Sequence, residues 1–208
     1  MTLIVHHLNN SRSQRILWLL EELNLSYEIR HYQRDPVTNL APDALCQVHP
    51  LGKSPLVEED GQVIFESGAI VEYLCARHGG EHLVPTRGTD AYLRYLEFMH
   101  FAEGSAMTPI LLNLYTARLG EAAAPLHARI QQQLDSHFAF MEQSLNATGW
   151  FVGDGLTGAD IMMSFPAEAA VKMGHAANRP NLAAFVEKIH ARPAFQTALE
   201  KGGPYAYA

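Results

Sequence analysis

Residues 49–74, HPLGKSPLVEEDGQVIFESGAIVEYL, contain the pattern that decides the fold. Two short β-type runs flank Asp60-Gly61, a dipeptide typical of a tight hairpin turn. Directly after the second run, Ser67 opens a stretch whose apolar residues recur at helical spacing. The segment therefore predicts two antiparallel strands followed by a helix.

The residues before this segment predict a strand, a helix and a second strand. They are TLIVHH (2–7), SRSQRILWLLEELN (11–24) and SYEIRHY (26–32). A crossover helix makes the two strands that it joins parallel, so the later hairpin adds an antiparallel edge to the same sheet. A polar, proline-punctuated loop over 36–50, with a short helix near 42–48, links the two parts.

The second half of the chain has almost no β signal. Residues 79–88, GGEHLVPTRG, read as a linker rich in Gly and Pro. A long helical pattern over 91–120, with a bend expected near Gly104 or Pro109, precedes a second one and three shorter helices. The sequence thus predicts a small α/β domain over 1–78, a linker over 79–88 and an all-α domain over 89–208.

Composition and charge argue against several classes of protein and partner. The 208 residues are 48% apolar and 18% charged, with a net charge of −7, so a packed protein is expected and nucleic acid and anionic membranes are poor default partners. The N-terminus does not resemble a signal peptide and no apolar run reaches membrane-spanning length, so a cytoplasmic protein is expected. The two cysteines exclude a disulfide framework, and the scattered histidines show no metal-ligand spacing. Cys75 is expected to be buried and inert, whereas Cys46 has no assignable role.

Three local signals each allow two interpretations. Ser54-Pro55 is either an ordinary loop proline or a cis bond that turns the main chain of Ser54 toward an extended ligand. Glu66 and Ser67 are either a solvated acid and a helix cap, or a carboxylate for an amine beside a helix N-terminus for a carboxylate. The polar residues 9–13, NNSRS, either cap the following helix or bind something negatively charged.

Together these stretches resemble the cytosolic glutathione S-transferases. SRSQRILWLLEEL, HPLGKSPLVEEDGQVIFESGAIVEYL and WFVGDGLTGADIMM match the family in its order over essentially the whole chain. The resemblance implies a thioredoxin-like N-terminal domain, an all-helical C-terminal domain and glutathione as co-substrate. It is strongest to bacterial and fungal, broadly theta-like, members.

The resemblance also implies roles for single residues in binding glutathione. Pro55 is the cis-proline, and Ser54 offers its main chain to the cysteinyl part. Ser67, with the Gly68 amide, takes the γ-glutamyl carboxylate, and Glu66 faces the amine. Lys53 reaches the glycyl carboxylate.

Family members stabilise the thiolate with Tyr, Ser or Cys just after the first strand. Ser11 lies four residues before Arg15, as the family's serine does, and is the predicted thiolate stabiliser. Asn10 is the second candidate, Asn9 and Ser13 are further candidates in the same polar stretch, and Arg12 adds positive potential. The alternative is that Ser11 only caps the helix.

The remaining expectations concern the helical half. A hydrophobic electrophile pocket between the domains is expected to use Met107, Leu111 and Tyr115, which share one helix face. Thr157 and Asp160 in TGAD fit a structural capping box. The tail GGPYAYA either folds back over the pocket or is frayed.

The leading hypothesis is an enzyme that conjugates glutathione to small apolar electrophiles, as a homodimer. Glutathione-dependent peroxide reduction or thiol–disulfide exchange is a second possibility, although disulfide exchange normally requires a cysteine in place of Ser11. A non-catalytic glutathione-binding or regulatory module is the third.

Overall fold

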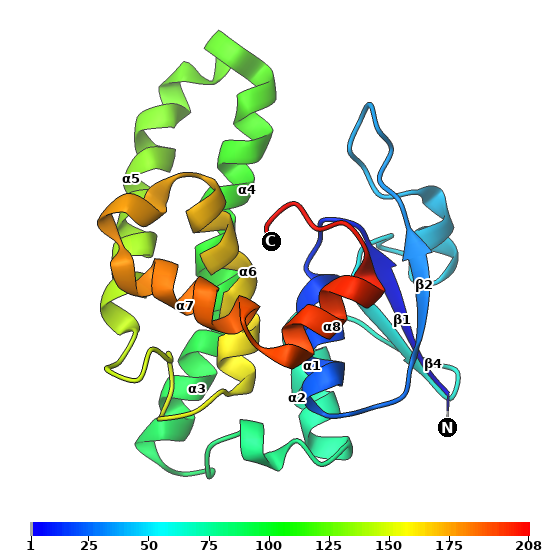
Figure 1. Cartoon of the computed structure of the whole chain (residues 1–208). Helices are drawn as coiled ribbons and strands as arrows, with labels where there is room; N and C mark the ends of the chain where they lie inside the picture. The colour runs from blue at the N-terminus through cyan, green and yellow to red at the C-terminus, as the bar shows by residue number, and fades with distance from the viewer. Residues whose placement is uncertain (1) are drawn as a thin grey trace. The chain divides into compact units, whose positions relative to one another are not determined.

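The computed structural model describes residues 2–208, which form two compact units (Figure 1). One unit comprises the chain up to Val84 together with His190–Ala208, and the other comprises Pro85–Ile189. Met1, the first residue of the predicted N-terminal domain, lies outside the described residues.

A mixed four-stranded sheet forms the centre of the first unit. Its strands are β1 (Leu3–Leu8), β2 (Glu28–Tyr32), β3 (Leu56–Glu59) and β4 (Gln62–Ile64). They lie in the order β2-β1-β3-β4, with β1 parallel to β2 and antiparallel to β3. Helix α1 (Ser13–Glu22) makes the crossover, and β3 and β4 form the hairpin around Asp60-Gly61. The predicted order of elements along the chain, the parallel pair and the antiparallel edge are confirmed.

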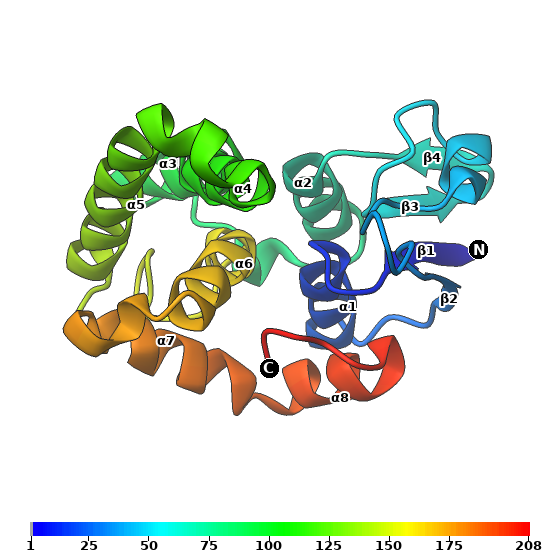
Figure 2. The ribbon, with the colours of Figure 1, turned by 90° about the horizontal axis from the view of Figure 1, so that it is seen from above.

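Both faces of this sheet are covered, so all six residues of β1 are buried. Helices α1 and α2 (Ser67–Arg77) lie on one side of the sheet (Figure 2). The short 3₁₀ helix η1 (Asp43–Gln47) covers the other, where Leu45 packs with Leu8 and Leu56. Because successive residues of a strand face opposite ways, His6 and His7 point to different sides of the sheet.

The end of the chain completes the first unit rather than the helical one. Helix α8 (Pro193–Gly202) packs along α1, where Trp18 meets Phe195 with ring centroids 5.4 Å apart. Arg192 donates to both carboxylate oxygens of Glu22 at 2.6 and 2.8 Å. This grouping differs from the prediction, which assigned all of 89–208 to the helical domain. Periodicity identifies an amphipathic helix but not the surface that its apolar face covers.

The second unit is built from α-helices. They are α3 (Asp90–Phe101), α4 (Met107–Thr116), α5 (Ala124–Ser144), α6 (Gly158–Lys172) and α7 (Pro180–His190), the last ending at the boundary with the first unit. The short segments η4 (Ala117–Ala123) and η5 (His175–Asn178) connect helices of this unit, whereas η2 (Glu81–Leu83) belongs to the first. The predicted long helix is interrupted by a π-helical segment, η3 (Ala102–Ala106), which contains Gly104. Within residues 2–208, no helix is both long and apolar enough to cross a membrane.

Helix α6 is the centre of this unit. Every residue from Gly158 to Ala170 is buried, and the helix packs against α3, α4 and α5. A helix buried on all sides needs apolar residues around most of its circumference, and α6 supplies them except along one stripe of buried polar residues, Asp160, Ser164 and Glu168.

Candidate active site

The polar residues after β1 form a tight corner that Arg34 holds together. Asn10 has a φ of 50°, a left-handed conformation that asparagine tolerates better than most residues. The main-chain N–H of Arg34 donates to Asn9 Oδ1 at 2.8 Å. Its guanidinium donates to the main-chain oxygens of Asn9 and Asn10 at 3.1 and 3.3 Å. Arg34 follows β2, and only the parallel pairing of β2 with β1 brings it to this corner.

Ser11 is only 4% exposed and bonds toward the protein interior. Its Oγ accepts the main-chain N–H of Ser13 at 3.2 Å and lies 2.8 Å from Ser13 Oγ. Ser13 Oγ in turn lies 2.9 Å from Nδ1 of His7. Ser11 therefore satisfies a main-chain donor at the start of α1, and its hydroxyl belongs to a buried hydrogen-bonded chain.

The C-terminal tail reaches the same corner. The main-chain N–H of Ala206 donates to Asn10 Oδ1 at 2.8 Å. This bond orients the Asn10 amide, because its oxygen is occupied by the tail and its NH₂ group must point elsewhere. The tail thus folds back onto the first unit, and its ring pair Tyr205–Tyr207 has centroids 5.3 Å apart.

The Ser54-Pro55 peptide bond is cis. Ser54 also bridges to β1, because its hydroxyl donates to the main-chain oxygen of His6 at 2.8 Å and accepts from the N–H of Leu8 at 3.3 Å. These two bonds fix the start of β3 beside the end of β1. Lys53, the preceding residue, is exposed.

Glu66 precedes α2 in an unusual backbone conformation. Its φ is 67° and its ψ is 121°, a combination that costs energy for a residue with a side chain and recurs at ligand sites. Ser67 is the first residue of α2, so Glu66 holds the N-cap position, and the Glu66 side chain makes no capping hydrogen bond. Ser67 therefore does not occupy the cap position that one of its two interpretations required: the helix begins one position earlier, and its first N–H groups are not met by a side-chain cap.

Strand pairing brings these pieces to one edge of the sheet. His6 pairs with Leu56 across β1 and β3, and Val57 pairs with Ile64 across β3 and β4. The end of β1, the start of β3 and the end of β4 consequently lie side by side. The same edge carries the polar corner, the cis-proline and the N-terminus of α2.

The three predicted pocket residues of the helical unit lie on α4. Met107 is buried, Leu111 is half-buried and Tyr115 is 60% exposed. Their spacing of four residues keeps them on one face of the helix, but this face passes from the core of the unit to its surface.

The TGAD motif forms the predicted capping box at the start of α6. Asp160 Oδ2 accepts the N–H and the hydroxyl of Thr157 at 2.9 and 2.6 Å, and Oδ1 accepts the N–H of Phe151 at 2.8 Å. Burial raises the pKa of Asp160 to about 6 despite these donors. The motif is structural, because all its contacts serve the loop and the first turn of α6.

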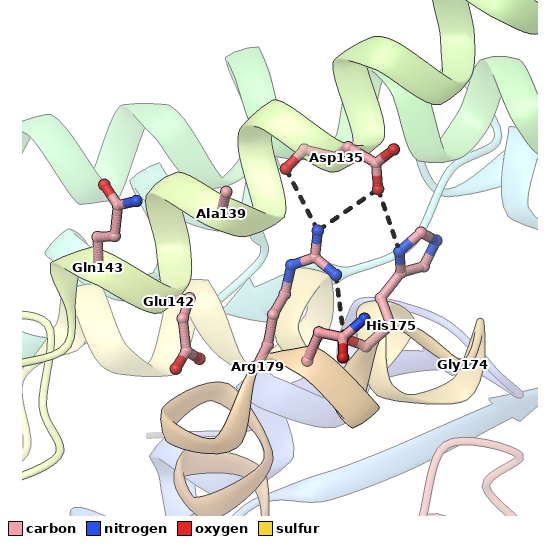
Figure 3. Close-up of a pocket in the computed structure, with 8 residues that line it drawn as sticks. Asp135, Ala139, Glu142, Gln143, Gly174, His175 and Arg179 are labelled. Carbon is pink, nitrogen blue, oxygen red and sulfur yellow. Dashed lines mark hydrogen bonds and ion pairs between the residues drawn. The ribbon is translucent and has the colours of Figure 1, made fainter.

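A hollow of about 350 Å³ lies on the helical unit, where α5 faces η5 and the start of α7 (Figure 3). Arg179 donates to the main-chain oxygens of His175 and Asp135 at 3.2 and 3.4 Å. Glu142 accepts the N–H groups of Asn181 and Leu182 at 3.0 and 2.7 Å. These charged groups bond one another and the first turn of α7, so they connect α5 to η5 and α7. No predicted site residue lines this hollow.

The two cysteines differ in accessibility. Cys75 is buried in α2, and burial raises the pKa of its thiol to about 12, as expected of an inert cysteine. Cys46 is exposed in η1. Among residues 2–208, no three histidine, cysteine or acidic side chains are grouped as metal ligands.

These features define a class of protein: a thioredoxin-like domain, with a cis-proline and a helix N-terminus at one sheet edge, joined to an all-helical domain. The chain matches family models described as glutathione S-transferase N-terminal domain, over residues 1–76, and C-terminal domain, over residues 105–202. It is 32% identical to glutathione S-transferase 3 of Schizosaccharomyces pombe, covering 96% of this chain and 87% of that protein. It is 30% identical to glutathione S-transferase 1 of Saccharomyces cerevisiae, covering 95% and 94%.

Solved structures agree with the sequence relatives. A glutathione S-transferase from Actinobacillus pleuropneumoniae superposes with a TM-score of 0.90 at 33% identity, covering 99% of this chain and 95% of that one. The chain belongs to the glutathione S-transferase family. The predicted family and fold are thereby confirmed.

Proposed function

We propose that this enzyme holds the thiolate of glutathione at the β1–α1 corner and conjugates it to small hydrophobic electrophiles, a detoxification reaction. One observation carries the proposal. A hydroxyl at a helix N-terminus, a cis-proline and a second helix N-terminus beside a carboxylate lie along one sheet edge. Each of these groups suits a different part of glutathione.

The ends of the tripeptide carry the charges that these groups recognise. Ser67 and the Gly68 amide face the γ-glutamyl carboxylate at the start of α2, where free N–H groups favour an anion. The strained backbone of Glu66 presents its carboxylate to the amine. Lys53 is exposed and reaches the glycyl carboxylate, while the main chain of Ser54 pairs with the cysteinyl part.

The thiol is the group that must be activated. A thiol with a pKa near 8.5 is mostly protonated at neutral pH, and lowering that pKa by two units requires about 2.7 kcal/mol. A hydrogen bond from the Ser11 hydroxyl to sulfur, with the positive end of α1, supplies stabilisation of this size. Asn10 is the second donor and Arg12 adds positive potential.

The electrophile is proposed to contact Met107, Leu111 and Tyr115. These side chains offer an apolar surface on α4 that becomes more exposed toward Tyr115. A surface of this kind favours small hydrophobic molecules without selecting sharply among them.

The assignment of the glutathione site is tested by retention on immobilised glutathione. The double variant Glu66→Ala with Ser67→Ala should lose retention, because it removes the carboxylate for the amine and the hydroxyl for the carboxylate. Glu121→Ala with Ser136→Ala, an exposed pair in the helical unit, is the control and should be retained like the parent. Full retention of the first double variant would reject this site.

Two wider features belong to the same proposal. Each α/β unit is proposed to join the helical unit of a second copy in a homodimer, supported by the exposed apolar side chains Leu51, Phe65, Leu93 and Phe140. Sedimentation at a mass of one chain, 23.1 kDa, would reject the dimer. The proposed location is the cytoplasm, where glutathione sets the thiol redox poise, and cell fractionation tests it.

A further inference from the structure

Behind Ser11 lies a chain of buried side chains that ends at the C-terminus of α8. Ser11, Ser13 and His7 are 4%, 0% and 3% exposed. Ser11 Oγ and Ser13 Oγ are 2.8 Å apart, and Ser13 Oγ and His7 Nδ1 are 2.9 Å apart. The two hydroxyls and the ring nitrogen therefore form a hydrogen-bonded chain that is buried from water, and few protons are available for its bonds.

A hydrogen bond on the side of the His7 ring opposite Ser13 determines which ring nitrogen carries the proton. The main chain of Gly202 forms a hydrogen bond to the ring that favours its protonated nitrogen, so the carbonyl is the acceptor. Because Nδ1 faces Ser13, this bond belongs to Nε2, and a side-chain carbon placed on Gly202 would lie only 3.4 Å from that atom. In neutral His7, Nε2 is thus the donor and Nδ1 is an acceptor.

The neutral form is the one present at neutral pH. Burial, with a smaller contribution from His31 on β2 in the same direction, lowers the pKa of His7 to about 4. The ring of His31 lies 5.7 Å from that of His7, edge to face. No acidic group contributes to the shift.

Which group donates in each of the remaining hydrogen bonds follows from the number of protons that the hydroxyls carry. A serine hydroxyl has one proton to donate. Ser13 gives its proton to His7 Nδ1 at 2.9 Å, a shorter contact than its other main acceptor, the oxygen of Leu8, at 3.3 Å. Ser13 Oγ then accepts from Ser11, so the Ser11 proton points into the protein.

We propose that Ser13, oriented by His7, competes with glutathione sulfur for the hydroxyl proton of Ser11. The inference rests on the proposed function, in which Ser11 donates to the thiolate. When the thiolate binds, the Ser11 hydroxyl rotates, so that its bond to Ser13 breaks and its bond to sulfur forms. No proton changes its parent atom. Ser13 and His7 are therefore positioning residues that set how strongly Ser11 stabilises the thiolate.

The test measures the pKa of the bound glutathione thiol, from the ultraviolet absorbance of the thiolate at saturating protein. In Ser13→Ala the inner acceptor is gone, so the thiol pKa should fall by about 0.5 to 1 unit relative to the parent. Ser13→Cys fills the same space with a weak acceptor and should shift the pKa in the same direction, which guards against a folding defect in Ser13→Ala.

Two further variants make the result specific. Ser164→Ala removes another buried serine hydroxyl, bonded to the main-chain oxygen of Ile161 in α6, and should leave the thiol pKa unchanged. In Ser11→Ala the thiol pKa should rise, and adding Ser13→Ala should then change nothing more, because the hydroxyl for which Ser13 and sulfur compete is already absent.

The outcomes separate this inference from the function on which it rests. A raised pKa in Ser11→Ala with an unchanged or raised pKa in both Ser13 variants overturns the competition and leaves Ser11 as the donor. An unchanged pKa in Ser11→Ala overturns the role of Ser11 itself, and the competition with it.

Discussion

At the scale of single residues, the neighbours of His7 determine what its ring can do. The side chain is enclosed by β2, α1 and α8, with a serine hydroxyl on one nitrogen and a main-chain carbonyl on the other. Neither partner supplies a negative charge to offset the loss of water, so the folded protein disfavours the imidazolium. His7 is consequently a neutral hydrogen-bonding group at neutral pH.

This burial predicts a pH dependence of stability. The pKa of His7 is about 4 in the folded protein and 6.5 in the unfolded chain, so between these values the unfolded state binds the proton first. Stability is therefore full above pH 6.5 and falls as the pH drops toward 4, by about 3 kcal/mol for this one group. Urea unfolding at pH 7.5 and at pH 4 should show this loss in the parent, and a loss smaller by that amount in His7→Gln.

The control for this prediction is His127→Gln, which alters an exposed histidine of α5. It should keep the pH dependence of the parent. Equal losses in the parent and in His7→Gln would mean that His7 is protonated at the same pH in the folded and unfolded states.

The sequence allowed some of these residues to be identified and not others. Ser11 and Asn10 follow from their position after a strand and before a helix. Ser13 was recognised only as a further candidate in the same stretch, and His7 and Arg34 were not identified, because the roles of all three depend on side chains that the parallel pairing of β1 with β2 and the packing of α8 bring together. A strand pattern shows that His6 and His7 face opposite sides, but not what either of them meets.

At the scale of the element, α6 depends on the loop before it. Asp160 satisfies three donors from this loop with its two oxygens. The helix it caps is buried on all faces and contacts three other helices of its unit. A local defect at this cap therefore affects the centre of the helical unit.

Asp160→Asn should lower the free energy of unfolding by about 2 to 4 kcal/mol, because an amide NH₂ then faces a buried main-chain N–H or hydroxyl donor. Equilibrium urea unfolding measures the change. Asp154→Asn makes the same substitution at an exposed position of the preceding loop, and its stability should stay within about 0.5 kcal/mol of the parent. Similar stability of both variants would show that the capping box contributes little.

The positions of helices and strands in the sequence were predicted better than the contacts between them. The hairpin, the crossover and the three shorter helices near the end of the chain followed from turn dipeptides and periodicity. The packing of α8 on α1 did not follow from the sequence, because it depends on contacts between residues far apart in the chain. Trp18 contacts Phe195, and Glu22 pairs with Arg192.

At the scale of the whole molecule, both ends of the chain belong to the unit that carries the proposed glutathione site. The first strand supplies the corner, and the last residues return to it through Gly202 and Ala206. Residues 85–189 form the helical unit between these two segments. The family models match both parts, so the whole chain, rather than one domain of it, belongs to the family.

The central claim is that the corner after β1 holds the sulfur of glutathione. A crystal structure of the protein with glutathione bound tests it most directly. The account predicts Ser11 Oγ within hydrogen-bonding distance of the sulfur, about 3 to 3.5 Å, with the γ-glutamyl group at Glu66 and Ser67. Sulfur placed beside another donor, with Ser11 still bonded only to Ser13, would contradict it.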